Sequence, residues 1–194
     1  MSAFSELLAA EFAPYGSLSQ SQLNLLEAHY ALLMHWNKRL NLTRITELSS
    51  VVRLHYCESL FLGLHLPKVV ELRIADVGSG AGFPGIPVAV VRPDCSVDLI
   101  ESHARKAVFL SEASRVLPNV CVISRRAEEC SAEYDWIVSR AVRPAEVLAL
   151  DLAPKAALLL NSEEAQGIGG EIFDLPWGEK HALLLTNVPR GTAR

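Results

Sequence analysis

The first 68 residues carry apolar side chains at steps of three and four, which is the spacing of amphipathic helices. This pattern predicts a short helix over residues 2–12. Ser19 and Gln22 fit a capping box at the start of a longer second helix. A third helix is expected from about residue 49 to residue 62. We therefore expect residues 1–68 to form a helical layer that precedes the rest of the fold.

After residue 68, short apolar runs alternate with helical patterns. Expected strands cover residues 72–77, 97–101, 120–124, 134–139, 157–160 and 182–186. Expected helices between them end near residue 91 and cover about 104–116 and 145–152. Strands separated by helices of this length predict an α/β fold, with a mostly parallel sheet covered by helices on both faces. No helix or strand is predicted for the polar, glycine-containing stretch 161–178.

The most informative stretch is residues 76–87, Asp-Val-Gly-Ser-Gly-Ala-Gly-Phe-Pro-Gly-Ile-Pro. It follows an expected buried strand and precedes a helix, which is the layout of a nucleotide-type cofactor site. The glycines Gly80, Gly82 and Gly85 fit a dinucleotide pattern. Asp76 with Gly78, Gly80 and Gly82 fits the pattern of an S-adenosylmethionine site. A carboxylate suits the cationic methyl donor better than an anionic pyrophosphate, so Asp76 favours the donor. A loop that binds no ligand is the third alternative.

Further candidates follow the next expected strands, where ligands bind in sheets of this kind. Glu101 is placed to accept the ribose hydroxyls of an adenosine, with Ser102 and His103 beside it. Main-chain groups of Ala127 and Glu128 are placed to read an adenine edge. Arg140 ends the fourth expected strand and suits a phosphate or a cofactor carboxylate. The alternative for each charged residue is an exposed surface or capping role.

The helical layer and its surroundings hold cations that suit an RNA backbone. Lys38, Arg39 and Arg44 lie near Trp36, which packs in the core or stacks on a base. The alternative is a helix C-terminus whose cations complement the dipole. The full set of candidate RNA contacts is Lys38, Arg39, Arg44, His55, Arg126, Arg140 and Arg143.

Composition limits the remaining function classes. The 194 residues suffice for one domain, and the net charge of −4 excludes a globally basic nucleic-acid binder. The four cysteines form no C-x-x-C pair, which favours reduced cytoplasmic thiols without a disulfide framework or metal site. No membrane span or signal peptide is expected. The motifs of amino-group and cytosine-C5 methylation are absent, whereas guanine N7 needs in-line positioning and no general base.

Taken together, the motifs resemble one bacterial family. Five segments occur in the order found in the 16S ribosomal RNA guanine-N7 methyltransferases, also called glucose-inhibited division protein B: Trp36–Thr43, His55 with Glu58–Leu60, Asp76–Pro87, Arg126–Glu129 and Ser139–Val142. The resemblance covers about residues 20–150. It implies a Rossmann-like class I methyltransferase core over residues 69–194, with residues 1–68 as an N-terminal helical extension of the same domain.

The resemblance also implies a function. The chain is expected to use S-adenosyl-L-methionine and to methylate N7 of a guanine in the decoding region of 16S rRNA. It is expected to act by positioning, without a catalytic acid or base and without a metal. Cofactor contacts are implied at Gly78, Phe83, Glu101–His103, Ala127, Glu128 and Arg140. The expected partner is 16S rRNA or the small ribosomal subunit, met by a cytoplasmic monomer. An NAD-dependent oxidoreductase and an inactive RNA-binding module are the alternatives.

The chain departs from this family in places. Glu58 stands where the family usually has Asp. Pro154-Lys155 and Asn161-Ser162 replace glycine-containing pairs on either side of the fifth expected strand. The region after about residue 155 looks shortened, which affects any substrate contact made from there. Arg190 is the remaining candidate for a terminal basic motif.

Overall fold

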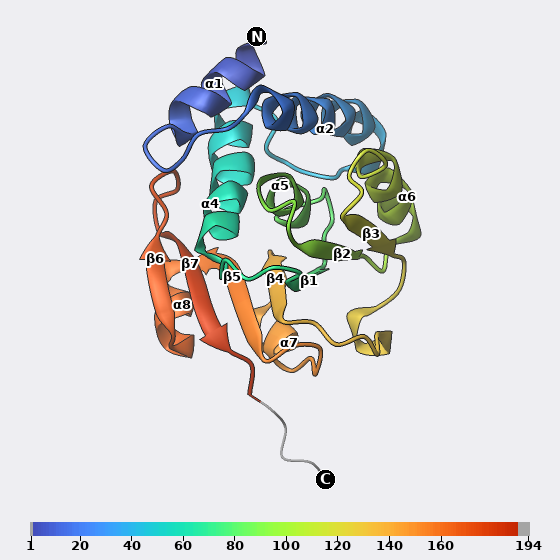
Figure 1. Cartoon of the computed structure of the whole chain (residues 1–194), viewed down its shortest axis with the longest axis vertical. Helices are drawn as coiled ribbons and strands as arrows, with labels where there is room; N and C mark the ends of the chain where they lie inside the picture. Colours follow the sequence, from blue (N-terminus) through green and yellow to red (C-terminus); the bar gives the residue numbers. More distant parts are fainter. Residues whose placement is uncertain (1, 190–194) are drawn as a thin grey trace.

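A seven-stranded sheet forms the centre of the protein, in a computed structural model that describes residues 2–189 (Figure 1). The strand order is β3-β2-β1-β4-β5-β7-β6. The first five strands are mutually parallel: β1 (Arg73–Val77), β2 (Ser96–Ile100), β3 (Val120–Ile123), β4 (Trp136–Arg140) and β5 (Lys155–Asn161). β7 (His181–Asn187) and β6 (Glu171–Asp174) are antiparallel. The expected Rossmann-like, mostly parallel sheet is confirmed.

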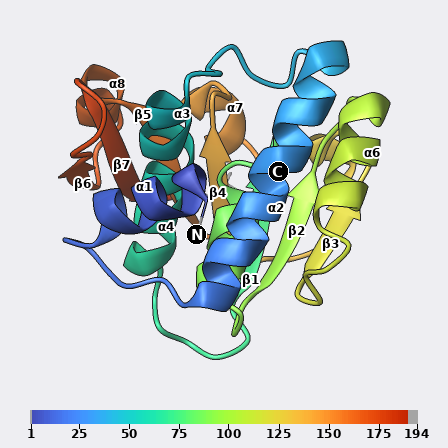
Figure 2. The same cartoon turned by 90° about the horizontal axis from the view of Figure 1, so that it is seen from above.

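Helices cover the two faces of the sheet unequally (Figures 1 and 2). One face carries the larger core, under α4 (Glu58–His65), α5 (Gly85–Val91) and α6 (Ala104–Ala113). The helices α1 (Ala3–Phe12) and α2 (Gln20–Leu40) lie over this layer and contribute to the same core. The short helices α7 (Pro144–Leu148) and α8 (Ser162–Ile168) lie on the other face. β1, β2, β4 and β5 are largely buried, which explains their apolar runs, whereas the edge strand β3 is only partly buried.

The end of α2 fixes the loop that leads to the candidate site. Ser19 and Gln22 form the expected capping box at the start of this helix. At its end, Asn41 adopts the left-handed conformation, with φ of 45°. Asn37 then donates to the carbonyl oxygen of Thr43 and accepts from the Thr43 N–H, both at 2.9 Å. These two hydrogen bonds hold the loop after α2 in one conformation.

The third expected helix is divided into α3 (Leu48–Val51), a π-helical turn η1 (Val52–Cys57) and α4. The N–H of Glu58 donates to the carbonyl oxygens of Arg53 and His55. The carbonyl of Leu54, which lies between them, accepts a hydrogen bond from Arg140 at 2.8 Å. π turns inside helices are common at functional sites, and apolar spacing does not reveal them.

The stretch without a sequence assignment contains α8 and β6. Asn161 is the N-cap of α8, and its side chain accepts a hydrogen bond from the Glu163 N–H. β6 pairs with β7 at the sheet edge, and its residues are mostly exposed. An exposed edge strand has no continuous apolar run, so the hydrophobic pattern did not predict it.

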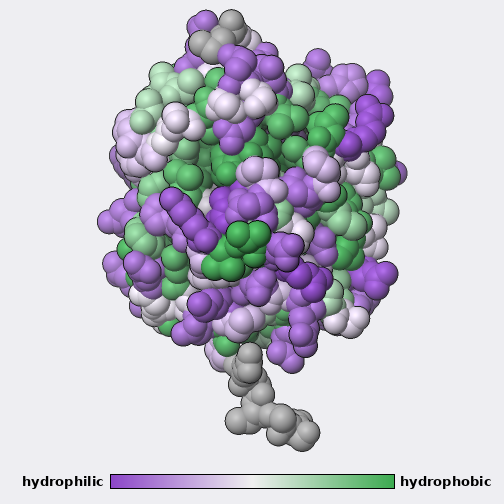
Figure 3. All heavy atoms as spheres, viewed as in Figure 1, coloured by the Kyte–Doolittle hydropathy of each residue, from purple (hydrophilic) through white to green (hydrophobic). Residues whose placement is uncertain are grey.

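Hydrophilic residues cover much of the surface seen in Figure 3, with smaller apolar areas between them. Within residues 2–189, none of the helices combines the length and apolar character needed to cross a membrane. Arg190, the candidate for a terminal basic motif, lies outside the described residues.

Candidate active site

The glycine-rich turn lies at the carboxyl end of β1 and leads into α5. Gly78, Gly80 and Gly82 have φ angles of 73°, 56° and 87°, which favour glycine. The N–H groups of Gly78 and Ser79 donate to the Ile100 carbonyl at 2.9 and 3.2 Å, so the turn is tied to the end of β2. A Cβ at Gly78 would lie 2.5 Å from a methyl group of Val142. This close approach also requires glycine.

Asp76 lies beneath the glycine-rich turn and is not exposed at the surface of the turn. Its side chain is fully buried, and its Oδ2 accepts a hydrogen bond from the Gly85 N–H at 3.0 Å. Its Oδ1 is the one buried side-chain polar atom without a partner among residues 2–189. Burial raises the pKa of Asp76 to about 7. Asp76 therefore occupies the N-terminus of α5 with a carboxyl group that is only half satisfied.

Glu101 closes the turn from the neighbouring strand. Its Oε2 accepts a hydrogen bond from the Gly80 N–H at 3.0 Å, and its Oε1 accepts one from the His103 N–H at 2.7 Å. Glu101 is buried, whereas Ser102 and His103 are exposed beside it. These contacts place the predicted ribose-binding residue directly against the glycine-rich turn.

The segment predicted to bind the adenine follows β3, the strand at the edge of the sheet. Ala127 and Glu128 lie in the short 3-10 helix η2 (Ala127–Glu129), just after β3. Because β1, β2 and β3 are parallel neighbours, the three predicted segments follow the carboxyl ends of adjacent strands. The sheet therefore brings the three segments to one edge, in their order along the chain.

Two buried side chains that the sequence interpretation missed support the turn from above. His29 of α2 hydrogen-bonds through Nε2 to the Ala81 carbonyl at 3.0 Å, and its Nδ1 lies 2.9 Å from the Tyr56 hydroxyl. A carbonyl only accepts, so Nε2 carries the proton and Nδ1 accepts from Tyr56. Burial lowers the pKa of His29 to about 4, which keeps the ring neutral. Its helical spacing from Leu26 and Leu33 was the available signal.

Arg140 joins the turn to the helical layer. Its Nη1 donates to the Leu54 carbonyl at 2.8 Å and to His55 Nδ1 at 2.7 Å. Its guanidinium carbon lies 5.0 Å from the centre of the Phe83 ring. Burial lowers the pKa of Arg140, although Glu58 and Asp76 oppose that shift. Arg140 therefore contacts both the glycine-rich stretch and η1.

The arginine also fixes the protonation state of His55. A guanidinium only donates, so His55 Nδ1 accepts and Nε2 carries the proton, which it donates to Thr43 Oγ1 at 2.8 Å. Burial, followed by the charge of Arg140, lowers the pKa of His55 to about 3. His55 is thus a neutral ring with both nitrogens engaged.

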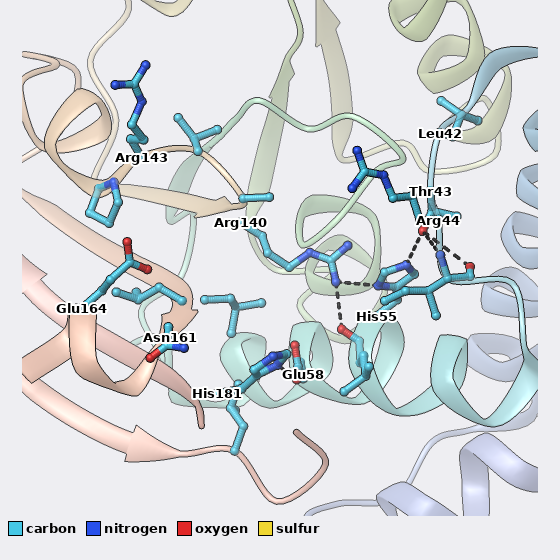
Figure 4. Close-up of a pocket in the computed structure, with 18 residues that line it drawn as sticks. Leu42, Thr43, Arg44, His55, Glu58, Arg140, Arg143, Asn161, Glu164 and His181 are labelled. Carbon is cyan, nitrogen blue, oxygen red and sulfur yellow. Dashed lines mark hydrogen bonds and ion pairs between the residues drawn. The ribbon is translucent and has the colours of Figure 1, made fainter. Parts of the chain in front are cut away.

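A cavity of about 680 Å³ opens beside this cluster, at the ends of β4 and β5 (Figure 4). Four predicted RNA contacts line it: Arg44, His55, Arg140 and Arg143. The Arg143 guanidinium points away from the cavity, is 85% exposed and pairs with Glu146 at 3.0 Å. Except for Arg140, the predicted cofactor residues lie outside this lining.

The structure does not bring the other predicted RNA contacts to this cavity. Lys38 and Arg39 are exposed on α2, and Arg39 lines a separate cavity of about 440 Å³ between α2 and α6. Arg126 is exposed after β3. Trp36 packs edge-on against Phe109 and donates to Glu112 at 3.0 Å, which is the packing alternative and not the stacking one.

A buried acid in the cavity was also missed as a site residue. Glu58, at the start of α4, is 2% exposed, and its Oε1 lies 2.7 Å from His181 Nδ1 on β7. Burial raises the pKa of Glu58, opposed by the hydrogen bond from His181. The two residues are 123 positions apart in sequence, and no motif connects them.

Comparison with known sequences shows clear relatives. Residues 22–160 match the family model of the rRNA small subunit methyltransferase G. A ribosomal RNA small subunit methyltransferase G from Desulforamulus reducens is 39% identical over 139 residues, which are 68% of this chain and 58% of that protein. The enzyme of the same name from Nitrosococcus oceani is 43% identical over 64% of this chain, and 58% of that protein is covered. The chain thus spans less than two thirds of the length of these two relatives. One from Staphylococcus saprophyticus is 32% identical over 86% of this chain and 80% of its own length.

Solved structures show the same fold at low identity. A SAM-dependent methyltransferase from Aquifex aeolicus has a TM-score of 0.55 at 17% identity, over 72% of this chain and 93% of its own. A SAM-dependent O-methyltransferase from Thermotoga maritima has a TM-score of 0.54 at 14% identity, over 83% of this chain and 73% of its own. Both are Rossmann-like class I methyltransferases, and this fold is also that of our chain. With the match over residues 22–160, this shows that the chain belongs to the rRNA small subunit methyltransferase G family.

Proposed function

We propose that the chain is an S-adenosyl-L-methionine-dependent methyltransferase that methylates N7 of a guanine in the decoding region of 16S rRNA. One observation carries the proposal: Arg140 lies between the glycine-rich turn and the 680 Å³ cavity, so a donor site and an acceptor site adjoin at one edge of the sheet. Ligands of open α/β sheets bind outside the carboxyl ends of the strands, where both sites lie.

The residues around the turn fit the methyl donor. When bound, S-adenosyl-L-methionine supplies a methyl group on a cationic sulfonium and also brings an ammonium group and a ribose. Glu101 gives this edge negative charge, and Asp76 adds to it when a cation favours its ionised form. The Asp76 Oδ1 is buried without a partner beneath the turn, so the field of a bound cation would stabilise its charge. Glu101 retains lone pairs for ribose hydroxyls beside its two backbone donors.

The same residues disfavour an NAD-dependent oxidoreductase. A dinucleotide places its pyrophosphate on the free N–H groups at a helix N-terminus. In this protein, the Gly85 N–H at the start of α5 already donates to the buried Asp76 carboxyl group. A pyrophosphate there would lie against two acidic side chains, Asp76 and Glu101.

The acceptor site is suited to positioning and not to proton transfer. N7 of guanine has a lone pair and no proton, so its methylation needs alignment with the donor. His55, which accepts a hydrogen bond from Arg140, is neutral with both nitrogens engaged and is not available as a base. Arg140 has further N–H groups that make no hydrogen bond to the described residues, and these are placed for base or phosphate oxygens.

The substrate RNA would contact exposed cations around the cavity. Arg44 and Arg143 lie at its rim, and Lys38, Arg39 and Arg126 extend the path along α2 and beyond β3. The proposal includes 16S rRNA or the small subunit as partner, and therefore a cytoplasmic location. Residues 1–68 and 69–194 would act as one domain in a monomer. The shared core beneath α1, α2 and α5 supports a single domain, and both sites belong to one chain.

The donor site is tested by calorimetric titration. We expect saturable binding of S-adenosyl-L-methionine and of S-adenosylhomocysteine, and none of NADH. Binding of NADH alone would overturn the donor assignment. An inactive RNA-binding module would bind RNA without labelled methyl transfer, so transfer to ribosomal particles excludes it.

A further inference from the structure

Glu58 is a buried acid whose carboxylate is only partly engaged. Its Oε1 lies 2.7 Å from His181 Nδ1, and Figure 4 shows the two side chains against each other. Its Oε2 accepts no hydrogen bond from residues 2–189, yet it is not among the buried polar atoms sealed without a partner. Because Glu58 lines the 680 Å³ cavity, Oε2 is the oxygen that a ligand in the cavity can reach.

The surroundings fix this carboxylate without neutralising it fully. Arg140 faces the same cavity, but its Nη1 is committed to Leu54 and His55, and it forms no ion pair with Glu58. The turn before β7 closes on the pair: a Cβ at Gly178 would lie 2.5 Å from His181 Nδ1 and 3.0 Å from Glu58 Oε1. Because Oε2 faces the cavity and accepts nothing from the described residues, it is free to accept hydrogen bonds from a ligand there.

We propose that Glu58 is the base-reading residue of the acceptor site, with its carboxylate accepting hydrogen bonds from N1–H and the 2-amino group of the target guanine. This inference rests on the proposed methyltransferase function. Adenine lacks the 2-amino group, and its N1 is an acceptor that would face the carboxylate, so the same contact rejects it. N7 lies on a different edge of the purine from N1–H and the 2-amino group, so pairing with Glu58 leaves N7 free to face the donor.

The same contact strengthens as the reaction proceeds. The N7 lone pair forms a bond to the methyl carbon while the carbon–sulfur bond breaks and its electron pair stays on sulfur. No proton moves, and the neutral guanine becomes a 7-methylguanine cation. A carboxylate against N1–H stabilises that developing charge more than it stabilises the neutral base. His181 is a positioning residue, since it holds Oε1 and leaves Oε2 for the base.

The test compares Glu58→Gln with Glu163→Gln, an exposed carboxylate of α8 that does not line the cavity. Both variants are expected to bind S-adenosylhomocysteine as the wild type does. Glu58→Gln is expected to lower kcat/KM for methyl transfer about tenfold or more, the usual range for a lost specific contact to a base edge. Glu163→Gln is expected to stay within about twofold of the wild type, as surface changes usually do.

A second measurement reads the base contact without turnover. Saturation-transfer NMR with excess S-adenosylhomocysteine compares guanosine, 7-methylguanosine and adenosine 5′-monophosphates as ligands. The wild type is expected to prefer 7-methylguanosine monophosphate over the adenosine form, and Glu58→Gln to lose that preference. His181→Phe is expected to weaken the preference without changing S-adenosylhomocysteine affinity, and it replaces Glu58→Gln if that variant does not fold.

The outcomes separate this inference from the function on which it rests. A wild type that binds no donor and transfers no methyl group overturns the proposed function. A wild type that is active, with Glu58→Gln equally active and equally selective, overturns the role of Glu58 alone. If Glu58→Gln does not fold, an unchanged preference in His181→Phe has the same meaning.

Discussion

Glu101 Oε2 lies 3.0 Å from the N–H of Gly80, so the acid that ends β2 directly braces the glycine-rich turn that ends β1. The same carboxylate accepts from the His103 N–H at the start of α6. Three elements are thereby fixed around one side chain before any ligand binds. Such preorganisation lowers the cost of ordering a cofactor site.

Replacing this side chain tests the donor site. Glu101→Ala should weaken S-adenosylhomocysteine binding about tenfold or more, because hydrogen bonds to a charged group are typically worth about 1.5–3 kcal/mol. Glu129→Ala, an exposed acid after β3, is the matched control and should leave the affinity unchanged in a calorimetric titration. Equal affinities for the two variants would remove Glu101 from the donor site.

Asp76 predicts a proton release on donor binding. The pKa of Asp76 is about 7, so at about pH 6 its carboxyl group is mostly protonated in the free protein. A cationic ligand favours the ionised form and lowers this pKa, so binding S-adenosyl-L-methionine at that pH should release a proton. Calorimetry in buffers of different ionisation enthalpy measures it. Asp76→Asn should abolish the release, and an equal release from this variant would assign the proton elsewhere.

The buried Tyr56–His29 hydrogen bond predicts a stability difference between two similar substitutions. Tyr56→Phe removes the donor to His29 Nδ1 and leaves a buried acceptor unpaired, which should cost about 1–3 kcal/mol of unfolding free energy. The hydroxyl of Tyr30 makes no hydrogen bond to the described residues, so Tyr30→Phe should be nearly neutral. Denaturant unfolding compares them, and equal costs would contradict the assigned network.

Two Gly→Ala substitutions should change the stability of the folded protein in opposite directions. At Gly85 a Cβ would clash with Leu99 and lie 2.5 Å from Asp76 Oδ2, so Gly85→Ala should destabilise by about 1–3 kcal/mol. At Gly167 of α8 nothing lies within 4 Å, and Gly167→Ala should stabilise by about 0.5–1 kcal/mol. Thermal unfolding measures both signs. A neutral Gly85→Ala would mean that α5 is not packed tightly on Asp76.

Arg140 should be sensitive even to lysine. Lysine keeps the charge, but it lacks the planar guanidinium that lies over the Phe83 ring and the further N–H groups that remain for a substrate. Arg140→Lys should lower the rate of methyl transfer about tenfold or more. Arg105→Lys, on α6 outside the larger cavity, is the control and should retain full activity. Equal rates would place Arg140 outside the acceptor site.

The sequence predicted the central parallel strands because they are buried and their apolar runs are continuous. The edge strand β3 is only partly buried, but it keeps a short apolar run and was also predicted. The capping box at Ser19 and the helix over 2–12 were equally readable, since both depend on local spacing. β6 was not, because an exposed edge strand needs no apolar residues on either face. The π turn was missed for another reason: Leu54 gains its partner from Arg140, 86 residues away.

The site divides in a similar way. Residues 76–85 and Glu101 were recognisable because a short motif and its distance along the chain carry the signal. Glu58 and His181 meet across two distant elements, and neither lies in a pattern that names its partner. Closeness in sequence can also mislead. Lys38 and Arg39 are near Arg44 along the chain, but they do not line the same cavity as Arg44.

The central claim is methylation of guanine N7 in 16S rRNA, and one assay tests it most directly. Labelled methyl transfer from S-adenosyl-L-methionine is measured on undermethylated small subunits and on free 16S RNA, and the modified base is then mapped. We predict label on N7 of a guanine in the decoding region. Label on any other atom, or no transfer by protein that binds the donor, would contradict the proposal.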